Sequence, residues 1–304
     1  MTSHRHIAKV YQSGNAKRTA AALFGLVLFW IAAPLFAGSV PAGVVDITLP
    51  FVAEDGKLYV RHGRGVLIGP RTVMTAAHVA GDFYSESLGR VRERVLWEGV
   101  QVKHLATGTK TFAAPDQVHL HPSVPLANKT GATLIPDSEI DAYLVGSARF
   151  YDVAVFGLKD SLGGEVANLP KLATSYPGIF EKLDVVVGSS QRRLIETVVT
   201  GIDRYTLHTK VAMDGALADN VTVPGDSGGP LFMRSARTGK LEVYGIASAL
   251  TNNAHDGSRS SLYSRADLVR GWVVAVADCV EQGSGPQCGV IARNEHDAAP
   301  VAMR

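Results

Sequence analysis

The sequence has very little net charge. Its 30 Lys and Arg residues nearly balance its 28 Asp and Glu residues, so the formal net charge over 304 residues is only +2. Like charges do not gather in long runs. A protein that binds nucleic acid or an acidic polymer through charge concentrates its basic residues in a run or a patch. The sequence therefore predicts no nucleic-acid partner.

Motifs for cofactors and metals are missing as well. We find no phosphate-binding glycine loop, no dinucleotide fingerprint and no aromatic-basic pattern. His119 and His121 alternate as neighbours on a strand would, but no Asp, Glu, His or Cys lies at the spacing of zinc ligands. We expect neither a metal nor a cofactor.

Cysteine is scarce: the chain has only Cys279 and Cys288, both placed after the expected core. Neither lies near a histidine in the sequence, which argues against a catalytic or metal-binding thiol. In an oxidising compartment the two can pair and close a short loop, which stabilises by roughly 2–3 kcal/mol when unstrained. The alternative is two free thiols in a loose tail, and we expect the disulfide.

The N-terminal region has the layout of a secretory signal. Basic residues between positions 4 and 18 precede an uncharged stretch from Thr19 to Val45, strongly apolar up to Ala37. Its core, Ala20 to Phe36, approaches the ~20 residues that span a bilayer, so an uncleaved anchor is the alternative. We assign residues 1–38 as signal peptide or signal anchor. We expect a secreted or periplasmic protein, or one anchored to the inner membrane and facing the periplasm.

The rest of the sequence consists of short β-prone runs broken by glycine and proline. Such runs between turn signals are typical of an all-β sandwich or barrel. Gly69-Pro70-Arg71 has the composition of a hairpin turn. The expected strands are Leu58–Arg61, Gly65–Ile68, Thr72–Thr75, Arg94–Trp97, Val153–Leu158, Leu183–Val187, Glu196–Ile202, Thr206–Val211, Leu231–Met233, Leu241–Ala247 and Ser261–Ser264.

One helix is expected, over Arg265–Val280. Apolar residues recur there at helical spacing and would bury one stripe, formed by Leu268, Trp272, Val273 and Val276.

Glycine-rich and proline-rich passages divide the chain. Gly163-Gly164 and Pro170–Gly178 look like the connection between two halves. We therefore expect an N-terminal domain over 39–170, a C-terminal domain over 171–280 and a loose tail over 281–304. Pro122–Ser147 reads as a surface loop inserted near the functional site.

The stretch Thr222-Val223-Pro224-Gly225-Asp226-Ser227-Gly228-Gly229-Pro230 places one serine among three glycines and two prolines. This composition predicts a sharply bent loop that presents a nucleophile. Glycines on both sides of Ser227 allow positive φ and let backbone N–H groups converge on one point, as stabilisation of an oxyanion requires.

Together with Thr75-Ala76-Ala77-His78 and Asp152-Val153-Ala154-Val155, this loop resembles the trypsin/chymotrypsin-like serine peptidases, in particular their bacterial members. The resemblance runs from about Gly63 to about Val276. The chain order of histidine, aspartate and serine matches that family and differs from the subtilisin and α/β-hydrolase orders. The resemblance implies an all-β fold of two six-stranded Greek-key β-barrels with a C-terminal α-helix, and an active site in the crevice between the barrels.

A serine hydroxyl needs a base within hydrogen-bond reach and a third group that orients the base. The resemblance implies that His78 takes the proton of Ser227 and passes it to the leaving amine, and that Asp152 orients the imidazole. It also implies that the N–H groups of Gly225 and Ser227 form the oxyanion hole.

The aspartate has two rivals, Asp116 and Asp141, which also lie between the histidine and the serine. Asp152 begins an otherwise apolar run, where an unpaired charge would be costly and a partner such as imidazole is expected. We therefore assign Asp152.

The sequence departs from the family at two places. In activated members, the aspartate that matches Asp226 pairs with a newly cut N-terminus, but no Arg/Lys-Ile-Val-Gly-Gly site is present. We expect Asp226 to bind another donor, which the sequence does not identify. Val79 follows the histidine where the family often has cysteine, so the first barrel must rely on packing instead of that disulfide.

Five residues are expected to contact the substrate: Val221, Ser248, Ala249, Leu250 and Ser261. Ala247 to Leu250 matches the family's edge segment, with which an extended peptide pairs. Val221 stands where trypsin has aspartate, so a buried Arg or Lys of the substrate would be left unpaired. With Leu250 and Ser261 in the walls, we expect a narrowed apolar pocket for small or medium uncharged residues.

The sequence thus predicts an exported serine endopeptidase that acts through an acyl-enzyme on Ser227, with a protein or peptide as substrate. One alternative is a catalytically silent scaffold of the same fold, with its cleft blocked by Pro122–Ser147 or its oxyanion loop collapsed. Another is an esterase-biased serine hydrolase. A contact with a membrane is expected only if the N-terminal segment stays as an anchor.

Overall fold

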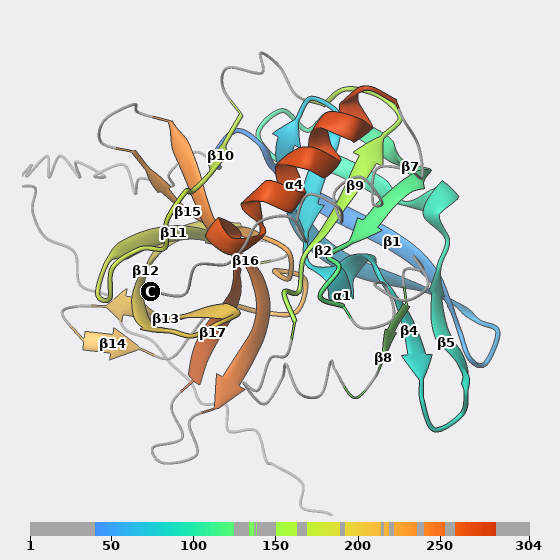
Figure 1. Cartoon of the computed structure of the whole chain (residues 1–304), viewed down its shortest axis with the longest axis horizontal. Coiled ribbons are helices and arrows are strands. Elements are labelled where there is room, and N and C mark those ends of the chain that lie inside the picture. The colour runs from blue at the N-terminus through green and yellow to red at the C-terminus, as the bar shows by residue number, and fades with distance from the viewer. Residues whose placement is uncertain are drawn as a thin grey trace, which may run out of the picture. The chain divides into compact units, whose positions relative to one another are not determined.

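The chain forms two closed six-stranded antiparallel β-barrels and one C-terminal helix in a computed structural model (Figure 1). The all-β fold class is confirmed. The structure describes residues 40–124, 134–136, 138, 150–162, 169–188, 192–213, 216–218, 222–235, 240–252 and 259–283.

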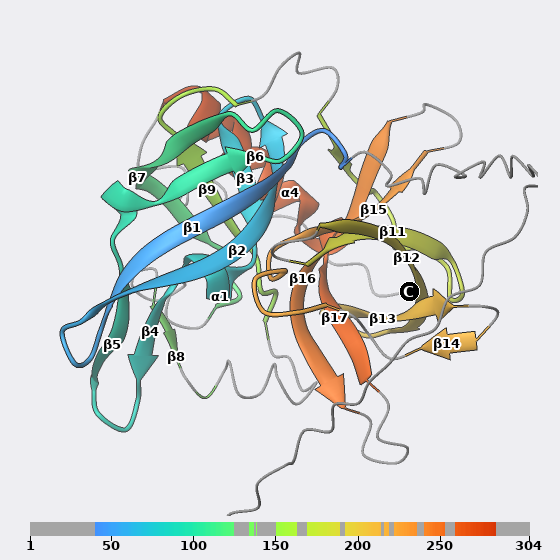
Figure 2. The same cartoon turned by 180° about the vertical axis from the view of Figure 1, so that it is seen from behind.

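The first barrel closes because β1 pairs with strands on both of its sides, β2 and β6. Around the barrel the order is β1-β2-β3-β9-β7-β6, a Greek key in which β9, the last strand of this barrel along the chain, lies beside β3. From β1 the sheet continues outward through β5, β4 and β8 (Figure 2). These strands are β1 (Val44–Ala53), β2 (Leu58–Gly69), β3 (Thr72–Thr75), β4 (Asp82–Ser85), β5 (Arg90–Val95), β6 (Gln101–His104), β7 (Lys110–Leu120), β8 (Leu134–Pro136) and β9 (Ala154–Leu158).

The second barrel repeats this strand order. Its path runs β11-β12-β13-β17-β16-β15 and closes where β15 pairs with β11. Two short strands, β10 and β14, flank it. The strands are β10 (Lys171–Leu172), β11 (Lys182–Val187), β12 (Arg193–Ile202), β13 (Thr206–Met213), β14 (Ala216–Ala218), β15 (Pro230–Arg234), β16 (Leu241–Asn252) and β17 (Arg259–Arg265).

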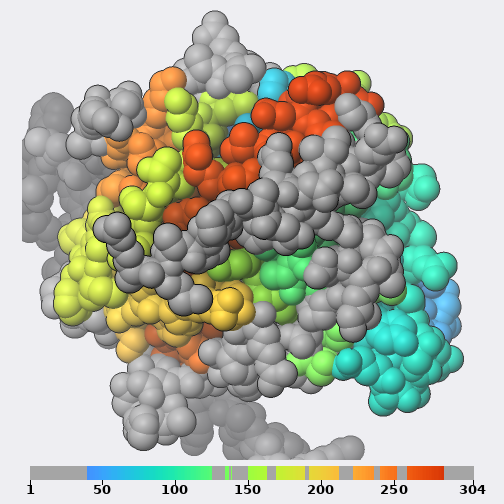
Figure 3. Space-filling view, in the orientation of Figure 1, coloured from blue at the N-terminus to red at the C-terminus, as the bar shows by residue number. Residues whose placement is uncertain are grey.

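The helix α4 (Ala266–Glu281) contacts strands of both barrels, including β9 and β16, and its outer face lies at the surface (Figure 3). Trp272, Val273 and Val276 are buried, as their helical spacing predicts. Leu268 was expected in the same stripe, but its side chain is 39% exposed. It lies in the first turn, at the border of the buried face.

Several sequence expectations need correction. The expected strand at Arg94–Trp97 is wrong in its second half, because β5 ends at Val95 and Trp97 begins a short 3-10 turn. The long strands β1 and β7 were missed. Pro115 interrupts the β7 pattern at a register shift between Ala113 and Val118, where a strand tolerates proline.

The turn at Gly69-Pro70-Arg71 is confirmed as a hairpin, with Gly69 opposite Thr72. The predicted signal, the Gly163-Gly164 connection, most of Pro122–Ser147 and nearly all of the C-terminal tail lie outside the described residues. Within the part of the chain that the structure describes, no helix is long and apolar enough to span a membrane.

Candidate active site

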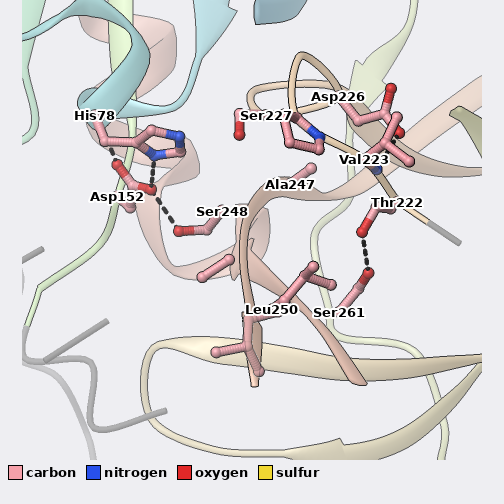
Figure 4. Close-up of a pocket in the computed structure, with 13 residues that line it drawn as sticks. His78, Asp152, Thr222, Val223, Asp226, Ser227, Ala247, Ser248, Leu250 and Ser261 are labelled. Atoms are coloured by element: carbon pink, nitrogen blue, oxygen red, sulfur yellow. Dashed lines mark hydrogen bonds and ion pairs between the residues drawn. The ribbon is translucent and has the colours of Figure 1, made fainter. Parts of the chain in front are cut away.

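Residues of both barrels line one pocket of about 290 Å³ (Figure 4). The predicted triad residues all reach it, and so do four of the five predicted substrate-contact residues. The fifth, Val221, lies outside the described residues. The lining residues are His78, Asp152, Thr222, Val223, Pro224, Asp226, Ser227, Ala247, Ser248, Ala249, Leu250, Ser261 and Leu262.

His78 lies on the short helix α1 (Ala77–Ala80), which follows β3. Asp152 contacts it twice: Oδ2 lies 2.6 Å from the ring nitrogen Nδ1, and Oδ1 accepts the His78 backbone N–H at 2.8 Å. Because Nδ1 faces the Asp152 carboxylate, Nδ1 carries the ring proton, and Nε2 is the basic nitrogen. In Figure 4 the Ser227 side chain lies on the side of the ring away from Asp152.

Asp152 is only 1% exposed and is held by the second barrel as well as the first. The Ser248 hydroxyl donates to its Oδ2, and its own backbone N–H donates to Ser264 Oγ at 2.9 Å. Burial raises the pKa of Asp152, but the charge and hydrogen bonds of His78, aided by Ser248, outweigh burial and hold that pKa below its ordinary value. The carboxylate is therefore ionised when it orients the imidazole.

Neither rival aspartate is among the described residues that line the pocket. Asp116 is exposed on β7, and Asp141 lies outside the described residues.

An arginine that the sequence analysis did not single out holds the turn that carries His78. Arg61 Nη1 donates to the carbonyl oxygens of His78, Val79 and Gly81 at 3.0, 3.1 and 3.1 Å. Its Nη2 pairs with Glu93 at 2.6 Å. The last carbonyls of a helix have no partner within the helix, so Arg61 supplies the donors that α1 lacks.

The loop around Ser227 is tightly bent, as its glycines predict. Gly225 and Gly228 have φ of +97° and +83°, in the region that favours glycine. A Cβ on Gly228 would collide with Thr75 Oγ1 and with the carbonyl oxygen of Arg64. The loop therefore approaches β2 and β3 more closely than any other residue would allow.

The N–H groups assigned to the oxyanion hole are available. Within the described residues, neither the Gly225 N–H nor the Ser227 N–H donates to a protein acceptor. Among these residues, no hydrogen bond joins the Ser227 hydroxyl to His78. The arrangement can accept a developing oxyanion and bring a hydroxyl beside an imidazole.

The pocket walls are mostly apolar. Leu250 lies on one side, 37% exposed, and the hydroxyls of Thr222 and Ser261 bind one another at 2.9 Å. Both lining carboxylates, Asp152 and Asp226, are already hydrogen-bonded. Among the described lining residues there is thus no unpaired charge to meet a charged substrate side chain.

The segment after Ile246 offers a backbone edge. β15 pairs with β16 only as far as Ile246, opposite Pro230, and beyond it β17 is the described neighbour on one side. Ser248 to Leu250 can therefore pair with an extended peptide on the other side.

Val79 and Gly63 pack closely against each other in the first barrel. A Cβ on Gly63 would lie 2.6 Å from Val79 Cγ1, so the valine fills the space that a side chain at position 63 would need. Packing is therefore close at this point of the first barrel.

The remaining cysteine and histidine predictions have separate outcomes. Cys279 is disulfide-bonded, while Cys288 lies outside the described residues. Cys279 belongs to the buried core, contrary to the expectation that it follows the core. His119 and His121 are buried. Among the described residues, no cluster of three or more His, Cys, Asp or Glu side chains could hold a metal ion.

Comparison of the sequence with known proteins assigns no family. No protein-family model matches the sequence, and no curated protein matches it. The two closed barrels and the C-terminal helix fit a trypsin-like fold.

Proposed function

We propose that the protein is an exported serine endopeptidase that hydrolyses peptide bonds through an acyl-enzyme on Ser227. The observation that carries this proposal is the two-point contact between Asp152 and His78 in the pocket that also contains Ser227. A base oriented by a buried carboxylate beside a serine is the arrangement that activates a hydroxyl.

In the proposed reaction, His78 Nε2 takes the Ser227 hydroxyl proton as Oγ attacks the scissile carbonyl. The oxyanion accepts hydrogen bonds from the N–H groups of Gly225 and Ser227. The imidazolium then gives its proton to the leaving amine, which departs and leaves an ester on Ser227. Water gives a proton to His78 as it attacks this ester, the bond between the acyl carbon and Ser227 Oγ breaks, and His78 returns the proton to Oγ as the acid is released.

We propose that the substrate is a protein or peptide cut after a small or medium uncharged residue. The apolar walls and the paired carboxylates give a buried cationic side chain no partner, and such a side chain would lose more in desolvation than it gains in packing. Leu250 lines this pocket and would narrow it for larger side chains.

Labelling with an organofluorophosphonate tests this proposal. Wild type should form a covalent adduct on Ser227, and Ser227→Ala should not react. Ser87→Ala, which changes an exposed serine in the turn between β4 and β5, should label like wild type. A wild type that never labels, or Ser227→Ala that labels equally, would favour the silent scaffold.

The esterase alternative is tested by turnover. A matched ester and peptide with the same residue before the scissile bond should both be cleaved at measurable rates. Turnover of the ester alone would replace the peptidase proposal with an esterase.

A further inference from the structure

Arg64 and Asp226 form a second buried charge pair beside the nucleophile. Arg64 Nη1 lies 2.7 Å from Asp226 Oδ1, and the two side chains are 1% and 2% exposed. Asp226 immediately precedes Ser227, whereas Arg64 lies on β2 of the first barrel. This is the donor that the sequence analysis could not identify for Asp226.

The guanidinium of Arg64 is almost fully satisfied. Besides Asp226, it donates to the carbonyl oxygens of Val186, at 2.6 Å, and Gly188, and it approaches Asp46 at 3.5 Å. An arginine has five N–H donors in a fixed fork, so it can bind several acceptors that one ammonium group could not reach together. Arg64 thereby connects the first barrel with the end of β11 and with the nucleophile loop.

The main chain of Arg64 binds the same loop. Its N–H donates to the carbonyl oxygen of Ser227 at 2.7 Å, and its own carbonyl accepts the Thr75 hydroxyl at 2.5 Å. Side chain and backbone of one residue therefore contact two consecutive residues of the loop, Asp226 and Ser227.

The Asp226 carboxylate in turn shapes the loop. Oδ2 accepts the Val223 N–H at 2.9 Å, and Oδ1 accepts the Gly188 N–H at 3.0 Å. Burial raises the pKa of Asp226, and the Val223 amide and the Arg64 guanidinium act against it. A buried carboxylate without its cation must take up a proton or turn toward water. Either change would release the turn from Val223 to Asp226, which contains Gly225.

We infer that Arg64 is a positioning residue, an internal cation that holds the Val223–Ser227 loop in the conformation that presents the N–H groups of Gly225 and Ser227. Because both charges belong to the folded barrels, the loop takes this conformation as the chain folds, without cleavage of the chain. The inference that Arg64 orders the loop depends only on the contacts of Arg64. The effect of Arg64 on catalysis rests on the proposed peptidase function.

Hydrogen exchange tests the positioning role without reference to activity. In Arg64→Met, amides of the 222–229 peptide should exchange at least ~10-fold faster than in wild type, while those of α4 keep their protection. The matched control is Arg71→Met, which removes a guanidinium that binds the Val280 and Glu281 carbonyl oxygens and the Glu281 carboxylate at the end of α4. There the end of α4 should lose protection and the loop should not. Unchanged exchange of the loop in a folded Arg64→Met protein would overturn the inference.

Kinetics then separate this role from general destabilisation. With an oxyanion loop out of place, Arg64→Met should lose about 10²–10³-fold in kcat and in the rate of fluorophosphonate labelling, with KM changed much less. Arg64→Lys should be intermediate, because it restores the charge but not the fork. A loss confined to KM would contradict the inference.

Two further results distinguish the role of Arg64 in ordering the loop from the peptidase proposal. If Arg64→Met does not fold, Asp226→Asn carries the same measurements, since it removes the charge and keeps the side-chain size; protected loop amides in it would overturn the inference. If wild type never labels, the peptidase proposal fails, and the exchange of the 222–229 peptide still decides whether Arg64 orders the loop.

Discussion

Asp152 binds His78 at two points, through the ring nitrogen Nδ1 at 2.6 Å and through the backbone N–H at 2.8 Å. A single carboxylate therefore sets both the ring orientation and the position of the turn that carries the ring. Ser248 and Ser264 attach the same aspartate to the second barrel. The His78 imidazole is thus aligned with respect to both barrels by one buried group.

Asp152→Asn should keep the fold and lose about 10⁴-fold in kcat, as the corresponding substitution does in a Ser-His-Asp triad. An amide cannot stabilise the imidazolium, and its NH₂ group favours the wrong ring tautomer. The measurement is kcat on a peptide substrate, with circular dichroism as the check on folding. A loss below tenfold would show that Asp152 does not orient the base.

Arg61→Met should lower the free energy of unfolding by about 1.5–3 kcal/mol, because three carbonyl oxygens lose a charged donor. It should also lower kcat by roughly 10- to 100-fold, because the turn with His78 shifts. Urea unfolding and steady-state kinetics measure the two effects.

The control for this variant is Arg94→Met, which removes an exposed arginine of β5. It should change neither quantity appreciably. Equal losses in the two variants would mean that total charge, and not the Arg61 contact, matters.

Leu250→Ala should widen the pocket. The ratio of kcat/KM for a substrate with phenylalanine before the scissile bond to kcat/KM for one with alanine should rise at least ~10-fold. Pocket space for one or a few more methylene groups changes the discrimination between two substrates by about this factor. Leu88→Ala, at an exposed leucine between β4 and β5, should leave the ratio as in wild type. Cleavage mainly after Arg or Lys in a peptide library would refute the predicted specificity.

Asp203 gives a pH dependence of stability. Burial raises the pKa of Asp203, but hydrogen bonds from His208, Thr206 and Tyr205 outweigh burial and hold that pKa well below its ordinary value. The unfolded chain, with a pKa of about 3.9, therefore takes up the proton first. The contribution of Asp203 is fully present above the unfolded pKa and is lost as the pH falls through the native pKa.

The expected result is a pH-dependent difference between wild type and Asp203→Asn. Wild type should be the more stable at pH of about 6, and the difference should shrink as the pH falls below about 4. Urea unfolding at several pH values measures it. A difference that grows on acidification would show that the pKa is raised.

The state of the N-terminus should not control activity. Because Asp226 is already paired with Arg64, it needs no terminal ammonium group. Chains with different N-termini should therefore form the fluorophosphonate adduct at the same rate. Intact mass of the labelled protein identifies which chains react. Labelling confined to chains with one new N-terminus would mean that a terminal ammonium group is required.

Local patterns predicted much of the fold. The turn at Gly69-Pro70-Arg71 and the helix with Trp272 and Val276 were recognised because glycine, proline and helical spacing act over a few residues. β7 was missed because Pro115 breaks its pattern at a register shift that only the neighbouring strand reveals.

The arginines of β2 were missed for another reason. Arg61 and Arg64 lie three positions apart on one strand and therefore point to opposite faces, one toward α1 and one toward Asp226. The one signal in the sequence is Gly63-Arg64-Gly65, an arginine between two glycines directly before an apolar run. A buried arginine requires an acid, but its partner is 162 positions away.

The sequence by itself determined the bent loop around Ser227, because the bend needs glycines at its own positions, and it determined the all-β character through short β-prone runs separated by turns. The partners of Asp226 and the support of the His78 turn were decided only by the tertiary structure. Charged side chains pair with whatever group closure of the barrels brings within about 3 Å, and that closeness is a property of the folded chain.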